Sequence, residues 1–280
     1  MVKHISFSAW QAWRQGCQWK WKHDQLDGLR SKAYGIHMDF GTACHDGIEL
    51  FRCRRPNPFV DIDVTVFFFR ERFKYLYAQN SDKYKPKDLE TPVDFFLKAG
   101  ENIIRRFHEC GELAEAEVLY NEHELYVDID RDDMSVKFKG FIDMVIKTKD
   151  KRGNTILYVI DFKTCSWGWP LEKKQDRNMH YQILLYKHFL CKKFNLDPKS
   201  VRTAFVLLLK RPRGDRTPVE FFPISAGPVS VQRAIDELNM DLTQIKSKEE
   251  ANNFRKDRTQ CKNSWGDICP YLDTELCQNT

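Results

Sequence analysis

The sequence lacks any long hydrophobic run. Its longest apolar stretches, near Val64–Phe69 and Ala204–Leu209, fall well short of the about 18 residues that cross a bilayer. The first residues, Met-Val-Lys-His-Ile-Ser, lack the apolar core of a signal peptide. There is also no internal repeat and no low-complexity tract. We therefore expect a cytoplasmic protein without a membrane partner.

The chain also lacks a strong charge of either sign. Its formal net charge is +5 over 280 residues, which permits a polyanionic partner without requiring one. Hydrophobic residues make up 42% and aromatic residues 13%, as in a packed globular protein. A chain of this length buries one large core, with room for a small additional lobe.

Cysteine is abundant. The nine cysteines, with no export signal, favour a reducing compartment and metal or thiol chemistry over a disulfide framework. Three of them, Cys261, Cys269 and Cys277, lie in a short C-terminal tail that is predicted to be a loop. Burial in a hydrophobic core does not readily explain cysteines in such a segment.

The stretch that organises the chain runs from Gly140 to Thr164. Residues 141–146 and 156–162 are rich in Ile, Val, Phe and Tyr and predict two strands joined by a hairpin loop at 150–154. Asp161 and Lys163 share one strand face because side chains alternate. Two carboxylates beside an ammonium can hold Mg²⁺ or Mn²⁺ at a phosphate. An ion pair on a surface hairpin is the plainer alternative.

A helical block precedes this hairpin. We expect helices from Gly41 through Leu50, over the aromatic-rich residues 62–79 and from Thr91-Pro92 onward. His45 lies on the first of these helices, where a single histidine is more often structural than a ligand.

The rest of the chain predicts an α/β core. Strands are expected at 116–120 and 124–129, one long helix at 171–194, a buried strand at 201–209, an edge strand at 218–224 and a helix at 229–245. The helix between the last two core strands predicts a crossover connection. Gln182 and Tyr186 are one turn apart on the long helix and face one groove.

Four motifs in this order resemble a known family. They are Gly41-Thr42-x-x-His45, Gly140-Phe141-Ile142-Asp143, Asp161-x-Lys163 and Gln182-x-x-x-Tyr186. Together they resemble the RecB-like branch of the PD-(D/E)XK nuclease superfamily, which includes the nuclease domains of RecB and AddB, CRISPR-associated exonucleases and many phage exonucleases. The family's Pro-Asp step is replaced here by Ile142-Asp143, a departure common in that branch.

The resemblance implies a restriction-endonuclease-like α/β fold: a mixed sheet flanked by helices, with a helical lobe and a cysteine-bearing C-terminal tail. It implies one nuclease domain over residues 1–280. Within it we expect the helical lobe at 35–110, the catalytic core at 113–209 and a cysteine-rich tail at 255–280 that packs with the N-terminal arm.

The resemblance also implies roles for individual residues. Asp143 and Asp161 would bind Mg²⁺ or Mn²⁺, with His45 and the backbone carbonyl of Phe162 as further ligands. Lys163 would orient the attacking water and offset phosphate charge. The remaining implied roles concern support or substrate contact. Gln182 and Tyr186 would steady the site or contact DNA, and Glu122 or Glu124 would supply an outer carboxylate.

Several family members hold a [4Fe–4S] cluster on one N-terminal and three C-terminal cysteines. Cys17 stands where the first would be, and Cys269-Pro270-Tyr271 resembles the family's Cys-Pro-aromatic step. The implied ligands are Cys17, Cys261, Cys269 and Cys277. The wide spacing of the tail cysteines leaves a structural Zn²⁺ or free thiols as alternatives.

Two further patterns point to nucleic acid. Cys17-Gln18-Trp19-Lys20-Trp21-Lys22 interleaves aromatics with lysines, as a base-stacking surface or an amphipathic edge does. The basic loop at 210–216 could track phosphates or be a solvated turn.

The leading hypothesis is a metal-dependent exonuclease acting on DNA ends or single strands, in the cytoplasm of a bacterial cell or phage-infected host, with a recombination or replication protein as a further partner. The alternatives are a non-catalytic nucleic-acid-binding module and an Fe–S interaction protein.

Overall fold

The structure is a computed structural model that describes residues 2–29, 34–53, 61–107, 109–110, 113, 116–262 and 268–278, without the side chains of 51–53 and 278. The Pro56-Asn57-Pro58 stretch, whose prolines predict a break in the chain, lies outside these residues. Among the described residues, no helix combines the length and apolar character needed to cross a bilayer.

The chain divides into two compact units. One contains residues 1–32, 125–140 and 228–280, and the other contains residues 33–124 and 141–227. Strands β2 (Glu117–Asp128) and β3 (Lys137–Lys149) run from one unit into the other.

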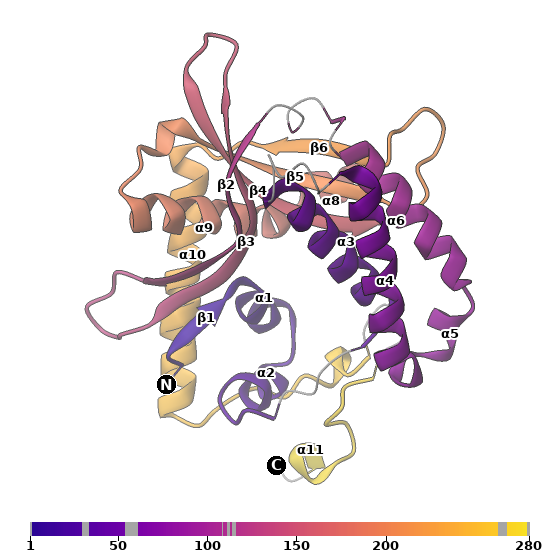
Figure 1. The fold of residues 1–280 in the computed structure, drawn as a ribbon. Helices are drawn as coiled ribbons and strands as arrows, with labels where there is room; N and C mark the ends of the chain where they lie inside the picture. The colour runs from indigo at the N-terminus through magenta and orange to yellow at the C-terminus, as the bar shows by residue number, and fades with distance from the viewer. Residues whose placement is uncertain are drawn as a thin grey trace. The chain divides into compact units, whose positions relative to one another are not determined.

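The fold is a mixed six-stranded sheet flanked by helices, as the sequence predicts. The strand order is β1-β3-β4-β5-β6, with β2 also paired to β3 (Figure 1). The remaining strands are β1 (His4–Ser6), β4 (Thr155–Cys165), β5 (Val201–Leu209) and β6 (Val219–Ile224).

The central hairpin forms as expected. β3 and β4 pair antiparallel from Met144↔Ile160 to Lys149↔Thr155. The loop between them is closed by Asp150, whose carboxylate accepts hydrogen bonds from the backbone N–H groups of Arg152 and Asn154. β4 pairs parallel with β5, which requires the crossover through the helix between them.

In the unit that holds this hairpin, helices pack on the sheet around an apolar core. They are α3 (Ile36–Cys53), α4 (Ile62–Asn80), α5 (Pro86–Leu89), α6 (Val93–Phe107), α8 (Leu171–Gln175) and α9 (Arg177–Phe194), with 3₁₀ turns at Ser81–Lys83 and Pro198–Ser200. Phe40, Phe69, Phe73 and Phe96 are fully buried in that core, which continues onto Ile160 of β4. The aromatic-rich segment thus packs through Phe69 and Phe73, whereas its Phe67, Phe68 and Tyr75 side chains are exposed.

Two expectations are wrong in detail. The strands expected at 116–120 and 124–129 form one continuous strand, β2, because the polar residues between them make no reversal. Glu122 instead adopts a left-handed backbone with φ 44° inside the strand. The long helix expected at 171–194 is divided at Asp176, whose side chain caps α9 by accepting the N–H of Asn178.

The other unit contains α1 (Phe7–Gln15), α2 (Gln18–Gln25), α10 (Pro228–Glu250), α11 (Glu275–Gln278) and a 3₁₀ turn at Arg258–Gln260. Ser6 caps α1, because its hydroxyl oxygen accepts the N–H of Ala9 at 3.2 Å. Trp10, Trp13 and Trp21 are buried in this unit, and Trp10 donates its indole N–H to Asp241 of α10 at 2.7 Å. Burial of Trp21 favours the amphipathic-edge interpretation of residues 17–22.

Candidate metal and nuclease site

The candidate site forms where the paired part of β3 and β4 ends, on the side away from their hairpin loop. Asp143 immediately precedes the first pair of the ladder, Met144↔Ile160, and Asp161 immediately follows Ile160. The backbone N–H of Phe162 donates to Oδ2 of Asp143 at 2.5 Å. The two aspartates that the sequence singles out are therefore brought together by adjacent strands.

Asp161 is the buried carboxylate of the site, with 3% of its surface exposed. Its Oδ1 accepts Nε2 of Gln182 at 2.7 Å. Its Oδ2 forms an ion pair with Nζ of Lys163 at 2.7 Å. A buried carboxylate needs such a positive partner, and an oxygen ligand of this kind also suits a divalent cation.

Lys163 lies on the same strand face as Asp161 and is partly exposed. Its ammonium donates to Oε1 of Gln182 at 2.8 Å, so one amide bridges the aspartate and the lysine. The same Nε2 lies 3.2 Å from the hydroxyl of Tyr186, one turn further along α9. The expected support pair thus contacts the Asp-x-Lys motif directly.

His45, Glu122 and Asp143 form a group in which one ligand atom from each residue lies within 4.8 Å of the others. His45 comes from α3, and its Nδ1 is 3.8 Å from Oδ2 of Asp143. The left-handed residue Glu122 adds a carboxylate from β2. Of the two glutamates that the sequence left open, Glu122 belongs to this group, while the backbone carbonyl of Glu124 accepts Nζ of Lys193.

The electrostatics of the group match a cation site. Burial, and then the neighbouring Asp161, raise the pKa of Asp143 well above its usual value. Partial burial, followed by Glu49, Asp46 and Asp161, raises the pKa of Glu122. Burial lowers the pKa of His45 and so favours the neutral imidazole that binds metals. Neighbouring carboxylates repel one another when both are ionised, and a bound divalent ion offsets this repulsion.

Phe162 contributes to the site through its backbone N–H and its ring. The ring centroid lies 5.3 Å from that of His45 in an edge-to-face contact and packs against Phe107 on the other side. This contact orients the imidazole. The role of the Phe162 carbonyl as a ligand stays a prediction.

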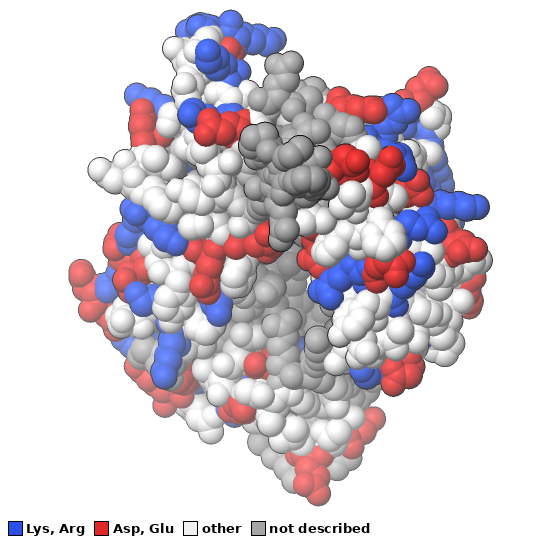
Figure 2. Space-filling view, viewed as in Figure 1, with Lys and Arg blue, Asp and Glu red and all other residues white. Residues whose placement is uncertain are grey.

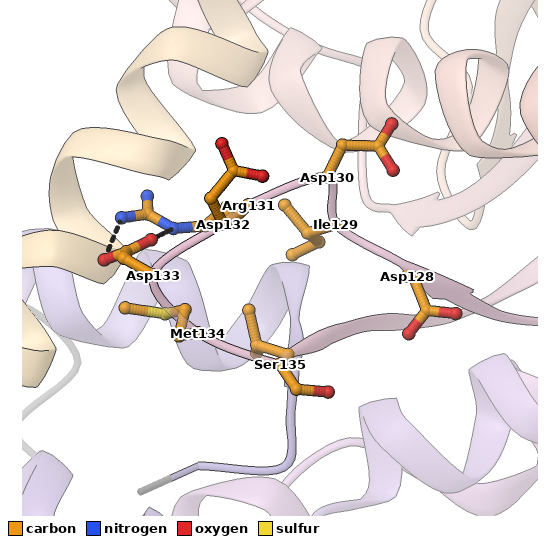
Figure 3. Close-up of a pocket in the computed structure, with 9 residues that line it drawn as sticks. Asp128, Ile129, Asp130, Arg131, Asp132, Asp133, Met134 and Ser135 are labelled. Carbon is orange, nitrogen blue, oxygen red and sulfur yellow. Dashed lines mark hydrogen bonds and ion pairs between the residues drawn. The ribbon is translucent and has the colours of Figure 1, made fainter.

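A surface pocket of about 740 Å³ lies apart from these residues in sequence, in the loop between β2 and β3. Figure 3 shows that the carboxylates of Asp128, Asp130 and Asp132 point in different directions, and that Arg131 pairs with Asp133. Among the described residues, these aspartates do not form a close ligand group like the one around His45. We therefore do not propose a metal site in this pocket.

The four cysteines expected to bind a cluster all belong to the unit with the chain's ends. Cys17 is the N-cap of α2, and its sulfur lies 3.3 Å from the N–H of Asp257, which donates to it. The N–H of Cys269 donates to the carbonyl of Cys261 at 2.7 Å. Burial, and then the neighbouring Cys269, Cys277 and Cys17, raise the pKa of Cys261.

All four of these thiols are half-buried and none is in a disulfide. The N-terminal arm and the tail are held together around them. Trp19 donates its indole N–H to the carbonyl of Leu276 at 2.7 Å, and Tyr271 donates its hydroxyl to Asp24 at 2.8 Å. Four thiols on two clasped segments form a donor set that fits a cluster or a zinc ion.

A family model described as "PD-(D/E)XK nuclease superfamily" matches residues 4–278. The chain belongs to the PD-(D/E)XK nuclease superfamily. Members of this superfamily are nucleases that use divalent metals such as Mg²⁺ or Mn²⁺, and nucleic acid is the substrate that the fold implies.

The other comparisons add little. A search of curated proteins finds no match. One solved structure, described as "Crystal structure of SSO0001", is similar to this chain at 15% identity over 72% of this chain and 84% of that one, with a TM-score of 0.30. A likeness this limited supports no inference about the site.

Proposed function

We propose that this superfamily member is a RecB-like, metal-dependent DNA exonuclease that hydrolyses phosphodiester bonds at DNA ends or in single strands. The main support is that adjacent strands bring Asp143, Asp161 and Lys163 close together. His45 and Glu122 lie beside Asp143. An ion pair on a surface hairpin does not require the two carboxylates and the imidazole that gather there.

The residues present fit a divalent ion, because His45, Glu122 and Asp143 combine two carboxylates with an imidazole whose burial favours the neutral form. Asp161 adds a buried carboxylate on the adjacent strand. Asp143, Asp161, Glu122 and His45 would hold the ion, and the imidazole favours Mn²⁺ beside Mg²⁺. When bound, the ion would supply charge on the scissile phosphate and acidify a water molecule.

Lys163 would contact the phosphate and the attacking water. Its ammonium is fixed by Gln182 and Asp161, so it is already oriented before substrate binds. Gln182 also holds the Asp161 carboxylate in place, and Tyr186 limits the rotation of that amide. These contacts make Gln182 a positioning residue.

Cys17, Cys261, Cys269 and Cys277 are proposed ligands of one [4Fe–4S] cluster, with a structural Zn²⁺ as the alternative. The support is their shared unit, half-burial and free thiols. Such a site would join residues 255–280 to the N-terminal arm, which are already linked by the contact between Trp19 and Leu276.

The proposed setting is phage or prokaryotic recombination or DNA processing, in the cytoplasm of a bacterial cell or an infected host. A recombination or replication protein is the proposed macromolecular partner besides DNA. These points rest on the resemblance of the four motifs to RecB-like nucleases.

The proposal is tested by comparing the cleavage of linear and circular single-stranded DNA of one sequence. Each is incubated with purified protein and Mn²⁺ or Mg²⁺. An exonuclease releases short products from the linear strand from the earliest times and leaves the circle intact. Cleavage of the circle at a similar rate would contradict exonuclease action, and no metal-dependent cleavage of either would contradict the nuclease proposal.

A further inference from the structure

An exposed tryptophan lies just beyond the strand that carries Asp161 and Lys163. β4 ends at Cys165, and Trp167 follows in the loop with 46% of its surface exposed. Its backbone carbonyl accepts Nη1 of Arg216 at 2.8 Å. Gly168 has φ 94°, and a Cβ there would lie 2.8 Å from the same Nη1, so the turn closes tightly on Arg216.

The loop between β5 and β6 is fixed beside this tryptophan. The N–H groups of Lys210 and Arg211 donate to the carbonyls of Cys165 and Ser166 at 2.9 and 2.8 Å, so the β4–β5 ladder continues past the strand ends. The loop extends beyond the strand ends as an orange hairpin in Figure 1. Trp167 and the basic loop are therefore anchored at the end of β4 that follows Lys163.

Two arginines of this loop lie over aromatic rings. The guanidinium carbon of Arg213 is 4.5 Å from the Trp167 ring centroid, and that of Arg211 is 4.4 Å from the ring centroid of Phe95. Within the described part of the chain, neither guanidinium makes an ion pair with a carboxylate. A guanidinium that lies over a ring keeps N–H groups for an anion.

On the face drawn in Figure 2, Lys and Arg side chains are interspersed with Asp and Glu side chains and do not gather in one broad basic patch. A broad basic surface on that face is therefore not what would hold a nucleic acid.

We propose that Trp167 and Arg213 form a stacking site for one unpaired base of a DNA strand, with Arg211 contacting the strand's phosphates. This inference rests on the proposed nuclease function and specifies its substrate as a single strand or a frayed end. Bases stack on aromatic faces with little sequence preference, whereas a duplex keeps its base faces covered. The alternative is a solvated turn with no role in binding.

The test measures the affinity of the protein for a fluorescent single-stranded oligonucleotide and for its blunt duplex, in EDTA to prevent cleavage and at one fixed salt concentration. The variants are Trp167→Ala, Trp167→Phe and Arg213→Gln. A matched control is Tyr75→Ala on α4, because Tyr75 is also exposed, at 57%, and also lies under an arginine, Arg72, at 5.9 Å.

We expect Trp167→Ala to weaken single-strand binding by about tenfold, as loss of one stacked base does, and to change duplex binding by less than about twofold. Trp167→Phe should restore most of the affinity, and Arg213→Gln should weaken it with the same strand preference. Tyr75→Ala should change neither. Melting curves check folding, and Arg213→Gln decides the matter if Trp167→Ala does not fold.

Unchanged single-strand affinity in the folded variants would overturn the proposal. An equal loss of affinity for the duplex would overturn it too, because it would indicate a general phosphate contact. The two proposals fail separately. Wild-type protein that binds a single strand through Trp167 but cleaves no DNA would refute the nuclease function alone, and cleavage without dependence on Trp167 would refute the stacking site alone.

Discussion

At the scale of single residues, the site depends on one amide. Gln182 accepts from Lys163 and donates to Asp161, so one amide holds both members of the Lys163–Asp161 ion pair. The ammonium and the carboxylate are each oriented by a hydrogen bond to the amide as well as by their ion pair. Such fixed orientation is what electrostatic catalysis requires.

Replacing Gln182 with alanine should therefore lower single-turnover cleavage by about tenfold to a hundredfold, with DNA affinity nearly unchanged. Tyr186→Phe, which removes only the hydroxyl next to the amide, should have a smaller effect in the same assay. A wild-type cleavage rate for Gln182→Ala would contradict a role of the amide in positioning Lys163 and Asp161.

Lys210 gives a prediction about pH. It is 8% exposed, and its Nζ contacts Nδ1 of His37 at 3.1 Å. Burial is the largest cause that lowers its pKa below 10.5, with Cys165 and Cys44 opposing and Arg211 reinforcing the shift. Below the lowered pKa, the folded state carries a poorly hydrated ammonium. As pH rises through that pKa towards 10.5, the folded state releases the proton first and gains stability.

Lys210→Met removes this contribution. The stability of the variant relative to wild type should be greatest near neutral pH and should shrink as pH rises towards 10.5. Urea unfolding of both proteins at pH 7.5 and pH 10 measures the difference. A difference in unfolding free energy that is the same at both pH values would contradict the assignment.

At the scale of elements, α4 and α6 pack so closely that one position tolerates only glycine. A Cβ on Gly100 of α6 would lie 1.9 Å from Cζ of Phe69, a fully buried ring on α4. Glycine to alanine in a helix usually stabilises it by about 1 kcal/mol. Here the clash outweighs that gain.

Gly100→Ala should destabilise the protein by about 1–3 kcal/mol in chemical unfolding, as overpacked cores do. Adding Phe69→Leu makes room for the new methyl group, so the double variant should lose less than the sum of the two single changes. Additive losses would place the cost in the helix backbone and not in the contact between α4 and α6.

The sequence predicted the elements that hold Asp143, Asp161 and Lys163, because runs rich in Ile, Val, Phe and Tyr specify those strands locally. It missed the break at Asp176, since the apolar pattern of residues 171–194 continues across a capping residue. It could not choose Glu122 over Glu124, because a left-handed residue inside a strand leaves no periodic signal. The bridge through Gln182 depends on the packing of α9 against the strands, which spacing alone does not give.

At the scale of the whole chain, the sequence's ends are held together. Cys17 accepts from the N–H of Asp257, 240 residues away, and Lys256 donates to the carbonyl of Cys277. A cluster or ion on the four cysteines would close this loop covalently. Loop closure of such length restricts the unfolded chain by roughly 5–6 kcal/mol in the chain-entropy model of a disulfide.

Cys17→Ser should therefore lower the melting temperature by several degrees and remove bound iron, with its broad visible absorption, from anaerobically purified protein. Cys110→Ser, a half-buried cysteine outside the four, is the matched control and should do neither. Colourless protein with stoichiometric zinc would replace the cluster with a zinc site. Metal-free and equally stable protein would remove the cofactor proposal.

Asp161 and its neighbours are proposed to form a metal-dependent hydrolytic centre. Cleavage of linear DNA is measured with Mn²⁺ or with EDTA, for wild type, Asp161→Asn and Lys163→Ala. The control is Asp132→Asn, an exposed aspartate of the loop in Figure 3. We expect no cleavage in EDTA and wild-type rates for the control. Asp161→Asn and Lys163→Ala should lose at least about 100-fold in rate while DNA binding stays within about tenfold. Near-wild-type turnover by either variant, or hydrolysis in EDTA, would contradict it.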